Sequence, residues 1–150
     1  RIEYTWTDHR VYRHKYPINE SYSFNYSLGF WAGPHAEESY FEYSFPLKGL
    51  DIFTTFSNVT RGKLTREMIV NQYKDIKDER YDGFKETRFV FSTKAIKSLF
   101  DKKVYFCLEG QYIKWNNAGF NPITPKITGN DISKLSINVE IIASTEVIFR

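Results

Sequence analysis

The amino-acid sequence predicts a mainly β chain, an antiparallel β-sandwich of about seven strands with one helix near residues 65–80. Large apolar side chains, mostly aromatic, alternate with small polar ones over residues 22–30, which is the period-2 pattern of a half-buried strand. The same alternation returns over residues 135–149, and short turns separate most of the predicted elements. The alternative is an α+β arrangement, a curved antiparallel sheet with helices on one face.

The first half of the chain contains four segments with strand character. An alternating segment opens the chain, the aromatic segment follows and ends at Gly33-Pro34, and a third alternating segment ends at Pro46. The fourth segment begins after Gly49 and alternates less regularly. We therefore expect strands at residues 2–6, 22–30, 39–45 and 50–56.

The pattern changes from strand to helix at Leu64. Thr65 is placed to cap the N-terminus of a helix, with Leu64 and Ile69 in the positions of a hydrophobic staple. Ile69, Tyr73 and Ile76 share one helix face, while the charged side chains between them face water. We expect this helix to pack one apolar stripe on the sheet.

The second half of the chain predicts three further strands and a short helix. Thr93 is placed to cap that helix, in which Ile96, Leu99 and Phe100 point inward. Residues 116–131 carry the densest turn chemistry and form the longest predicted loop. With no internal repeat or linker, residues 1–150 are expected to form a single β-rich domain. The strands are expected at residues 86–91, 104–115 and 135–149.

The composition indicates a globular domain with an aromatic core. The chain contains 13 Phe, 11 Tyr and 3 Trp, and each such ring buries about 150–250 Å² when it enters a core. The formal net charge of +3 is too small to argue for a nucleic-acid partner. No apolar run reaches the roughly 18–20 residues that a membrane helix needs, so we expect no transmembrane segment in this chain.

A basic segment near the start of the chain interleaves positive charge with Tyr12. Such a segment suits an exposed arm or an edge strand whose charges oppose sheet-to-sheet aggregation. The alternative is a surface for nucleic acid or an anionic membrane, because aromatic rings between basic residues stack on bases. The basic patch consists of His9, Arg10, Arg13, His14 and Lys15.

The sequence has no motif for catalysis, a metal or a cofactor. His9 and His14 are five residues apart, so they share neither a strand face nor a helix face. Cys107 lies between Phe106 and Leu108, which is the setting of a small, buried and inert thiol. We therefore expect no bound metal or cofactor and no enzyme activity, an enzyme built from dispersed residues being the least favoured alternative.

Two segments that combine a Trp with turn residues form the candidate binding surface, namely residues 30–35 and 115–122. A flat indole stacks on a sugar or anchors a protein partner, and Asn side chains add directional hydrogen bonds. The alternative is that both indoles cap the ends of the core while the amides form turns. The candidate binding residues are Trp31, His35, Tyr112, Trp115, Asn116, Asn117 and Phe120.

These features predict a non-catalytic recognition domain that binds a protein or glycan partner through its Trp/Asn-rich loops. One alternative is a structural or assembly subunit that self-associates by pairing sheet edges. A second alternative is a carrier that holds a small apolar ligand between aromatic faces. The chain does not begin with Met, which favours a processed protein or an excised segment, and we expect an extracytoplasmic location.

Overall fold

The computed structural model describes residues 1–9, 22–23, 26–27, 30–70, 83–100, 103–123 and 130–143. Within these residues the chain forms eight strands and one short helix. The elements are β1 (Ile2–Trp6), β2 (Tyr22–Ser23), β3 (Tyr26–Ser27), β4 (Ala36–Leu47), β5 (Leu50–Arg61), α1 (Arg66–Val70), β6 (Glu86–Leu99), β7 (Val104–Asn116) and β8 (Ile132–Ala143).

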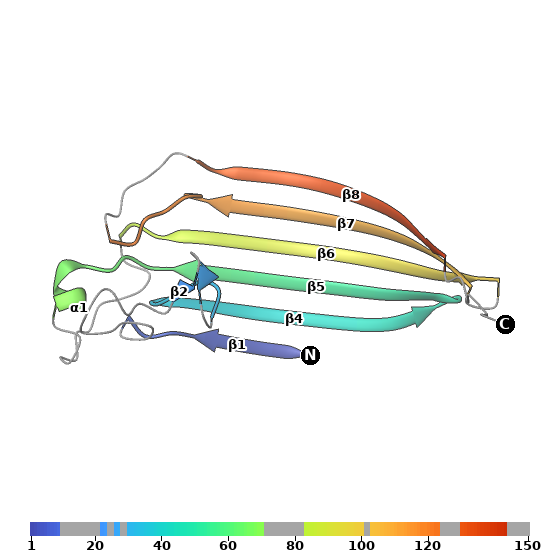
Figure 1. Cartoon of the computed structure of the whole chain (residues 1–150), viewed down its shortest axis with the longest axis horizontal. Coiled ribbons are helices and arrows are strands. Elements are labelled where there is room, and N and C mark those ends of the chain that lie inside the picture. Colours follow the sequence, from blue (N-terminus) through green and yellow to red (C-terminus); the bar gives the residue numbers. More distant parts are fainter. Residues whose placement is uncertain are drawn as a thin grey trace.

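Six of the strands form one antiparallel sheet in the order β1-β4-β5-β6-β7-β8. Figure 1 looks down the shortest axis of the molecule and shows these strands side by side in a single layer. The other sheet among the described residues is the two-residue pairing of β2 with β3. The prediction of a mainly β chain with a helix is confirmed, but the described residues contain no second layer of a sandwich.

The register of the sheet gathers apolar side chains on one side. Residues that lie opposite each other in antiparallel strands point to the same face. One such row runs across all six strands through Ile2, Phe41, Phe56, Phe91, Tyr112 and Leu135. We call the side that carries this row the apolar face, and three charged strand residues share it, namely Glu37, Lys97 and Lys114.

The opposite side of the sheet, which we call the polar face, carries most of the charge of the strands. It also bears scattered apolar side chains such as Phe53 and Ile142. Its charged residues are Glu3, Glu38, Glu42, Asp51, Arg61, Glu86, Arg88, Lys94, Glu109, Lys134 and Glu140.

The buried core of the described residues lies at one end of the sheet. That end contains α1, the start of β4 and the segments that follow β1, β5 and β7 (Figure 1). Leu64 and Met68 are the largest side chains that are almost fully buried, and Ala36 is completely buried. Cys107 near the start of β7 is also buried, as expected for a free strand cysteine.

The turn between β4 and β5 uses two residues in the left-handed region. Lys48 has φ 50° and Gly49 has φ 76°. A two-residue hairpin turn with positive φ at both central residues matches the right-handed twist of the two strands. Leu47 therefore pairs with Leu50, and the register of this hairpin follows from its turn.

The prediction of one continuous strand over residues 22–30 is wrong. The described parts of this segment are β2 and β3, which pair with each other, Tyr22 with Ser27 and Ser23 with Tyr26. Alternation of side chains cannot distinguish one long strand from two short ones that pair. Neither β2 nor β3 belongs to the six-stranded sheet.

The prediction of a short helix that begins at Thr93 is also wrong. Strand β6 continues through this segment to Leu99, with Ile96 opposite Asp51 of β5 and Cys107 of β7. Hydrogen bonding to a strand on each side satisfies the backbone that a helix would have satisfied internally. Tertiary pairing therefore overrides the local helical pattern, and the expected helix between strands 86–91 and 104–115 is absent.

The cap of the predicted helix is confirmed. The Met68 N–H donates a hydrogen bond of 3.2 Å to Thr65 Oγ1, as an N-cap requires. The described helix covers Arg66–Val70, so the remainder of the helix expected up to residue 80 lies outside the described residues. The strand expected over 135–149 begins earlier, at Ile132, and its last six residues lie outside the described residues as well.

Candidate functional site

A small pocket opens on the polar face at the end of the sheet that holds the core. It encloses about 110 Å³, well below the roughly 300–1,000 Å³ of a site for a drug-sized molecule. Its size suits one functional group of a larger ligand. The pocket is lined by Trp31, Ala32, Val59, Arg61, Glu86, Arg88 and Trp115, and we call it the indole–arginine pocket.

The sheet register brings the lining residues together from distant parts of the sequence. Val59 of β5 lies opposite Arg88 of β6, and Arg88 lies opposite Trp115 of β7. Arg61 and Glu86 form the next pair on the same face. Trp31 comes from the segment before β4, where the Gly33 N–H donates a 2.9 Å hydrogen bond to the Phe30 carbonyl and closes a turn.

The guanidinium of Arg88 contacts both indoles of the pocket. Its Cζ atom lies 5.3 Å from the ring centroid of Trp31 and 5.3 Å from that of Trp115. Each contact is within the range of a cation–π interaction, in which the negative ring face attracts the cation. The two Trp residues predicted as binding residues are therefore joined through one arginine.

Two carboxylates hold the indoles in place. The Trp31 Nε1–H donates to Glu38 Oε2 at 3.0 Å, and the Ser57 hydroxyl donates to the other oxygen of Glu38 at 2.6 Å. The Trp115 Nε1–H donates to Glu86 Oε1 at 2.7 Å. Because each ring nitrogen has a carboxylate partner, the orientation of both rings is set before any ligand arrives.

The arginines of the pocket retain unused hydrogen-bond donors. Arg61 Nη1 lies 3.7 Å from Glu86 Oε2, so this arginine has an anionic neighbour. Arg88 has no ion pair with any described carboxylate. The Nε atoms of both Arg61 and Arg88 are buried and have no hydrogen-bond partner within the described part of the chain.

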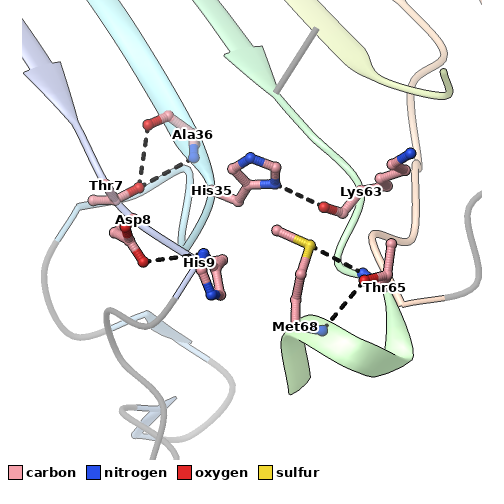
Figure 2. Close-up of polar contacts among 8 residues, drawn as sticks. All are labelled: Thr7, Asp8, His9, His35, Ala36, Lys63, Thr65 and Met68. Atoms are coloured by element: carbon pink, nitrogen blue, oxygen red, sulfur yellow. Dashed lines mark hydrogen bonds and ion pairs between the residues drawn. The ribbon is translucent and has the colours of Figure 1, made fainter. Parts of the chain in front are cut away.

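A second polar cluster fastens the segments of the buried end to one another (Figure 2). The Thr7 hydroxyl donates to the Gly33 carbonyl at 2.7 Å and accepts from the Ala36 N–H at 3.2 Å. His35 Nδ1 lies 2.7 Å from the Lys63 carbonyl, and because a carbonyl only accepts, Nδ1 carries the proton. His35 is buried, and Figure 2 draws His9 and Met68 below its ring, so this ring lies inside the buried end.

His35 is therefore a buried structural residue, outside the indole–arginine pocket. Its φ of 54° places it in the left-handed region where the chain enters β4. The ring of His9 is also buried, with its centroid 6.4 Å from that of His35 and its Nδ1 3.1 Å from Asp8 Oδ1. This burial corrects the expectation of a solvent-facing His9. The other members of the basic patch, Arg10, Arg13, His14 and Lys15, lie outside the described residues.

The structure separates the remaining predicted binding residues from the pocket. Tyr112 and Asn116 lie on the apolar face, where the Asn116 amide donates to Thr87 Oγ1 at 2.9 Å. Asn117 is buried, has φ 56° and donates to the Lys85 carbonyl at 3.2 Å. Phe120, three residues further along the chain, is also buried. Two of the seven predicted residues, Trp31 and Trp115, thus line the pocket.

The sequence interpretation missed the charged residues of the pocket. Arg61 lies beyond the strand expected at residues 50–56, Glu86 and Arg88 lie in the strand expected at 86–91, and none of the three is among the candidate binding residues. Only strand pairing shows that Arg88 lies opposite Trp115. The sequence pattern predicts a helix from Thr93, whereas in the structure this part of β6 pairs with β7 as far as Leu99 opposite Val104.

The apolar face is the other prominent feature of the molecule. Three side chains of β8, Leu135, Ile137 and Ile141, are 70–71% exposed. Aromatic pairs lie further inward, with Phe56 and Phe89 at a centroid distance of 5.2 Å. The large exposed side chains of this face are Ile2, Tyr4, Trp6, Phe41, Tyr43, Leu47, Phe91, Leu99, Phe106, Leu108, Tyr112, Leu135, Ile137, Val139 and Ile141.

The described residues hold no group of three or more His, Cys, Asp or Glu side chains placed to bind a metal ion. Among these same residues, no helix has the length and apolar character needed to cross a membrane. Comparison with protein-family models, with curated proteins and with solved structures finds no match to this chain.

Proposed function

We propose that this chain is a non-catalytic assembly domain that binds a second copy of itself through the apolar face, completing a β-sandwich. The observation that carries the proposal is the exposure of large apolar side chains of that face on five of the six strands, β1, β4, β6, β7 and β8. Contiguous apolar surface beyond a few hundred Å² marks an interaction site, because its contact with water is unfavourable. A sheet with one apolar face has the form of one layer of a sandwich.

The size of the apolar face suits a stable dimer. Strands β4, β5 and β8 have 12 residues each, and at about 3.3 Å per residue they are about 40 Å long. Six strands spaced by about 4.8 Å give a width of about 24 Å. The face therefore measures about 1,000 Å² per copy, and burying it on two copies reaches the roughly 1,200–2,000 Å² of a standard specific interface.

A second copy fits the charges of this face. A two-fold axis parallel to the strands places β4 of one copy over β7 of the other, because the strand order is reversed across the interface. Glu37 lies in the same row as Asn116, and Lys114 is two residues from Asn116 on the same face. This arrangement brings the carboxylate of Glu37 near the ammonium of Lys114 from the second copy, twice per dimer.

The same arrangement stacks apolar side chains at the centre of the interface. Phe91 of one copy faces Phe56 of the other, since both lie in one row of the two central strands. Leu108 likewise faces Phe45, which belongs to its row. The polar faces, with their indole–arginine pockets, point away from the interface on both sides of the sandwich.

The oligomeric state and its response to one buried charge test the proposal. Sedimentation over a concentration series is expected to give twice the 17.8 kDa mass of the chain. Leu108→Glu places an unpaired charge in the interface, so we expect dimer affinity to fall by about 100-fold or more. Gln111→Glu adds the same charge to the same strand on the polar face and is expected to leave affinity within about threefold.

Other occupants of the apolar face give different results in this experiment. A monomer at about 100 μM, far above the Kd of stable dimers, would refute the second copy as the occupant. A dimer that Leu108→Glu does not weaken would point to pairing of sheet edges, since β8 pairs only with β7 among the described residues. Far-ultraviolet circular dichroism of both variants confirms that the sheet is retained.

A further inference from the structure

We propose that the indole–arginine pocket binds a carboxylate group. This inference concerns the opposite face of the sheet and does not rest on the assembly proposed above. Arg88 carries a positive charge. Among the described residues, its guanidinium has cation–π contacts with the rings of Trp31 and Trp115 and no ion pair. Ring faces attract a cation but accept none of its in-plane N–H groups.

The carboxylates nearest in the structure to the indoles are already engaged by other donors. Glu38 accepts from Trp31 and Ser57, and Glu86 accepts from Trp115 while Arg61 lies beside its second oxygen. Neither forms an ion pair with Arg88. The pocket therefore contains a fixed guanidinium that still lacks an anion.

The orphan donors of the pocket identify the kind of group that fits. The Nε atoms of Arg61 and Arg88 are two of the three buried side-chain nitrogen or oxygen atoms that lack a hydrogen-bond partner in the described residues. A buried donor without an acceptor costs free energy, so two of them at one pocket indicate a site for an acceptor. A planar carboxylate matches a guanidinium with two parallel N–H···O bonds.

The remaining lining selects an acid on an apolar stem. Ala32 and Val59 are buried and line the pocket beside the charged groups. They offer methyl groups to the carbon chain that carries the carboxylate, and the half-exposed indole of Trp31 lines the same pocket. A glutamate side chain and a sugar acid both have this chemistry, and the experiment below separates them.

Nuclear magnetic resonance of the indole N–H groups tests the proposal directly. The protein has three Trp residues, and Trp6 on the apolar face serves as an internal reference. N-acetylglutamate amide and glucuronate are expected to shift the Nε1–H signals of Trp31 and Trp115 with a Kd on the order of 1 mM, because each offers one small group. N-acetylglutamine amide and glucose, the uncharged counterparts, are expected to leave both signals in place.

Variants of β6 connect this response to Arg88. Arg88→Gln is expected to weaken carboxylate binding by more than tenfold, whereas Lys94→Gln removes an equal charge from the same face outside the pocket and is expected to change it by less than twofold. Arg88→Lys keeps the charge but loses the planar pair of donors, so we expect it to weaken carboxylate binding at least fivefold. This variant tests the proposal if Arg88→Gln fails to fold.

The outcomes decide between the proposal and its rivals. A stronger response to N-acetylglutamate amide than to glucuronate assigns the acid to a protein partner, and the reverse assigns it to a glycan. Equal shifts with the glutamine amide would overturn the carboxylate proposal, as would equal binding of inorganic phosphate. Unchanged carboxylate binding by folded Arg88→Gln would overturn it as well.

Discussion

The two ends of the sheet differ in what surrounds them. At the end with α1, side chains from several segments pack around β4 and β5, and Ala36, Leu64 and Met68 are almost completely buried. Toward the other end the strands form a single layer, and large apolar side chains such as Tyr43 and Leu47 are about half exposed. Strand pairing builds the sheet at both ends, but only a second layer removes side chains from water.

The largest effect on stability is expected for a truncation in the buried end, and a truncation on the apolar face provides the comparison. Leu64→Ala removes a buried side chain and should lower the free energy of unfolding by about 2–5 kcal/mol. In dilute protein, Leu108→Ala should cost about 1 kcal/mol or less, because that side chain is nearly half exposed. Urea unfolding followed by circular dichroism measures both values.

Protein concentration sharpens that comparison. If a second copy covers the apolar face, the cost of Leu108→Ala should rise with concentration, since association stabilises the folded state by mass action. The cost of Leu64→Ala should stay constant. Equal costs for the two variants in dilute protein would show that the two ends do not differ as the structure indicates.

A smaller effect on stability is expected at the turn between β4 and β5, at the end of the sheet away from α1. Gly49 has φ 76°, which side chains on L-residues adopt only with strain, so Gly49→Ala should destabilise the fold by about 1–2 kcal/mol. Gly110 in β7 is the matched control, because a Cβ there would meet no atom within 4 Å and its φ is not positive. Gly110→Ala should be neutral or stabilise by up to about 1 kcal/mol. Thermal unfolding of the two variants gives the comparison.

The smallest effect concerns a tyrosine on the polar face of β4. The Tyr40 hydroxyl donates a 2.7 Å hydrogen bond to Glu42 Oε2, and this bond, together with burial, raises the pKa of Tyr40 above its ordinary value. Because the folded pKa is the higher one, the stabilisation is fully present below pH about 10, the ordinary tyrosine pKa, and is lost as the pH rises through the folded pKa. Glu42→Gln should therefore lower the pKa of Tyr40.

Tyrosine Cζ chemical shifts recorded against pH measure this pKa. The Tyr40→Phe variant identifies the resonance, since it removes one signal from the spectrum of 11 tyrosines. An unchanged Tyr40 pKa in Glu42→Gln would mean that the hydrogen bond does not set it.

The sequence predicted the sheet better than it predicted the site. The pattern of side chains predicted strands that overlap β1, β4, β7 and β8, because the direction of each side chain along a strand is a local property. The wrong predictions occurred where one local sequence pattern is compatible with two different structures. The alternation over residues 22–30 suited two short strands as well as one, and the helical spacing after Thr93 gave way to pairing on both sides of β6.

The sequence indicated part of the indole–arginine pocket. An indole beside turn residues suits recognition, which predicts Trp31 and Trp115 as binding residues, and the structure places both around Arg88. His35, Asn117 and Phe120 shared the same turn-rich segments but pack into the buried end. Burial in a loop depends on what the rest of the chain places there, so composition alone could not separate the two groups.

By itself, the sequence determined that this chain forms strands with one apolar and one polar side, because alternation with period 2 is written residue by residue. The tertiary structure decided which strands are neighbours, and thereby that Arg88 meets two indoles and that the apolar sides align into one face. It also decided that this face stays exposed in the described chain. The turn at Lys48 and Gly49 sets the register of one hairpin locally. Strand order and layering depend instead on contacts between residues far apart in sequence.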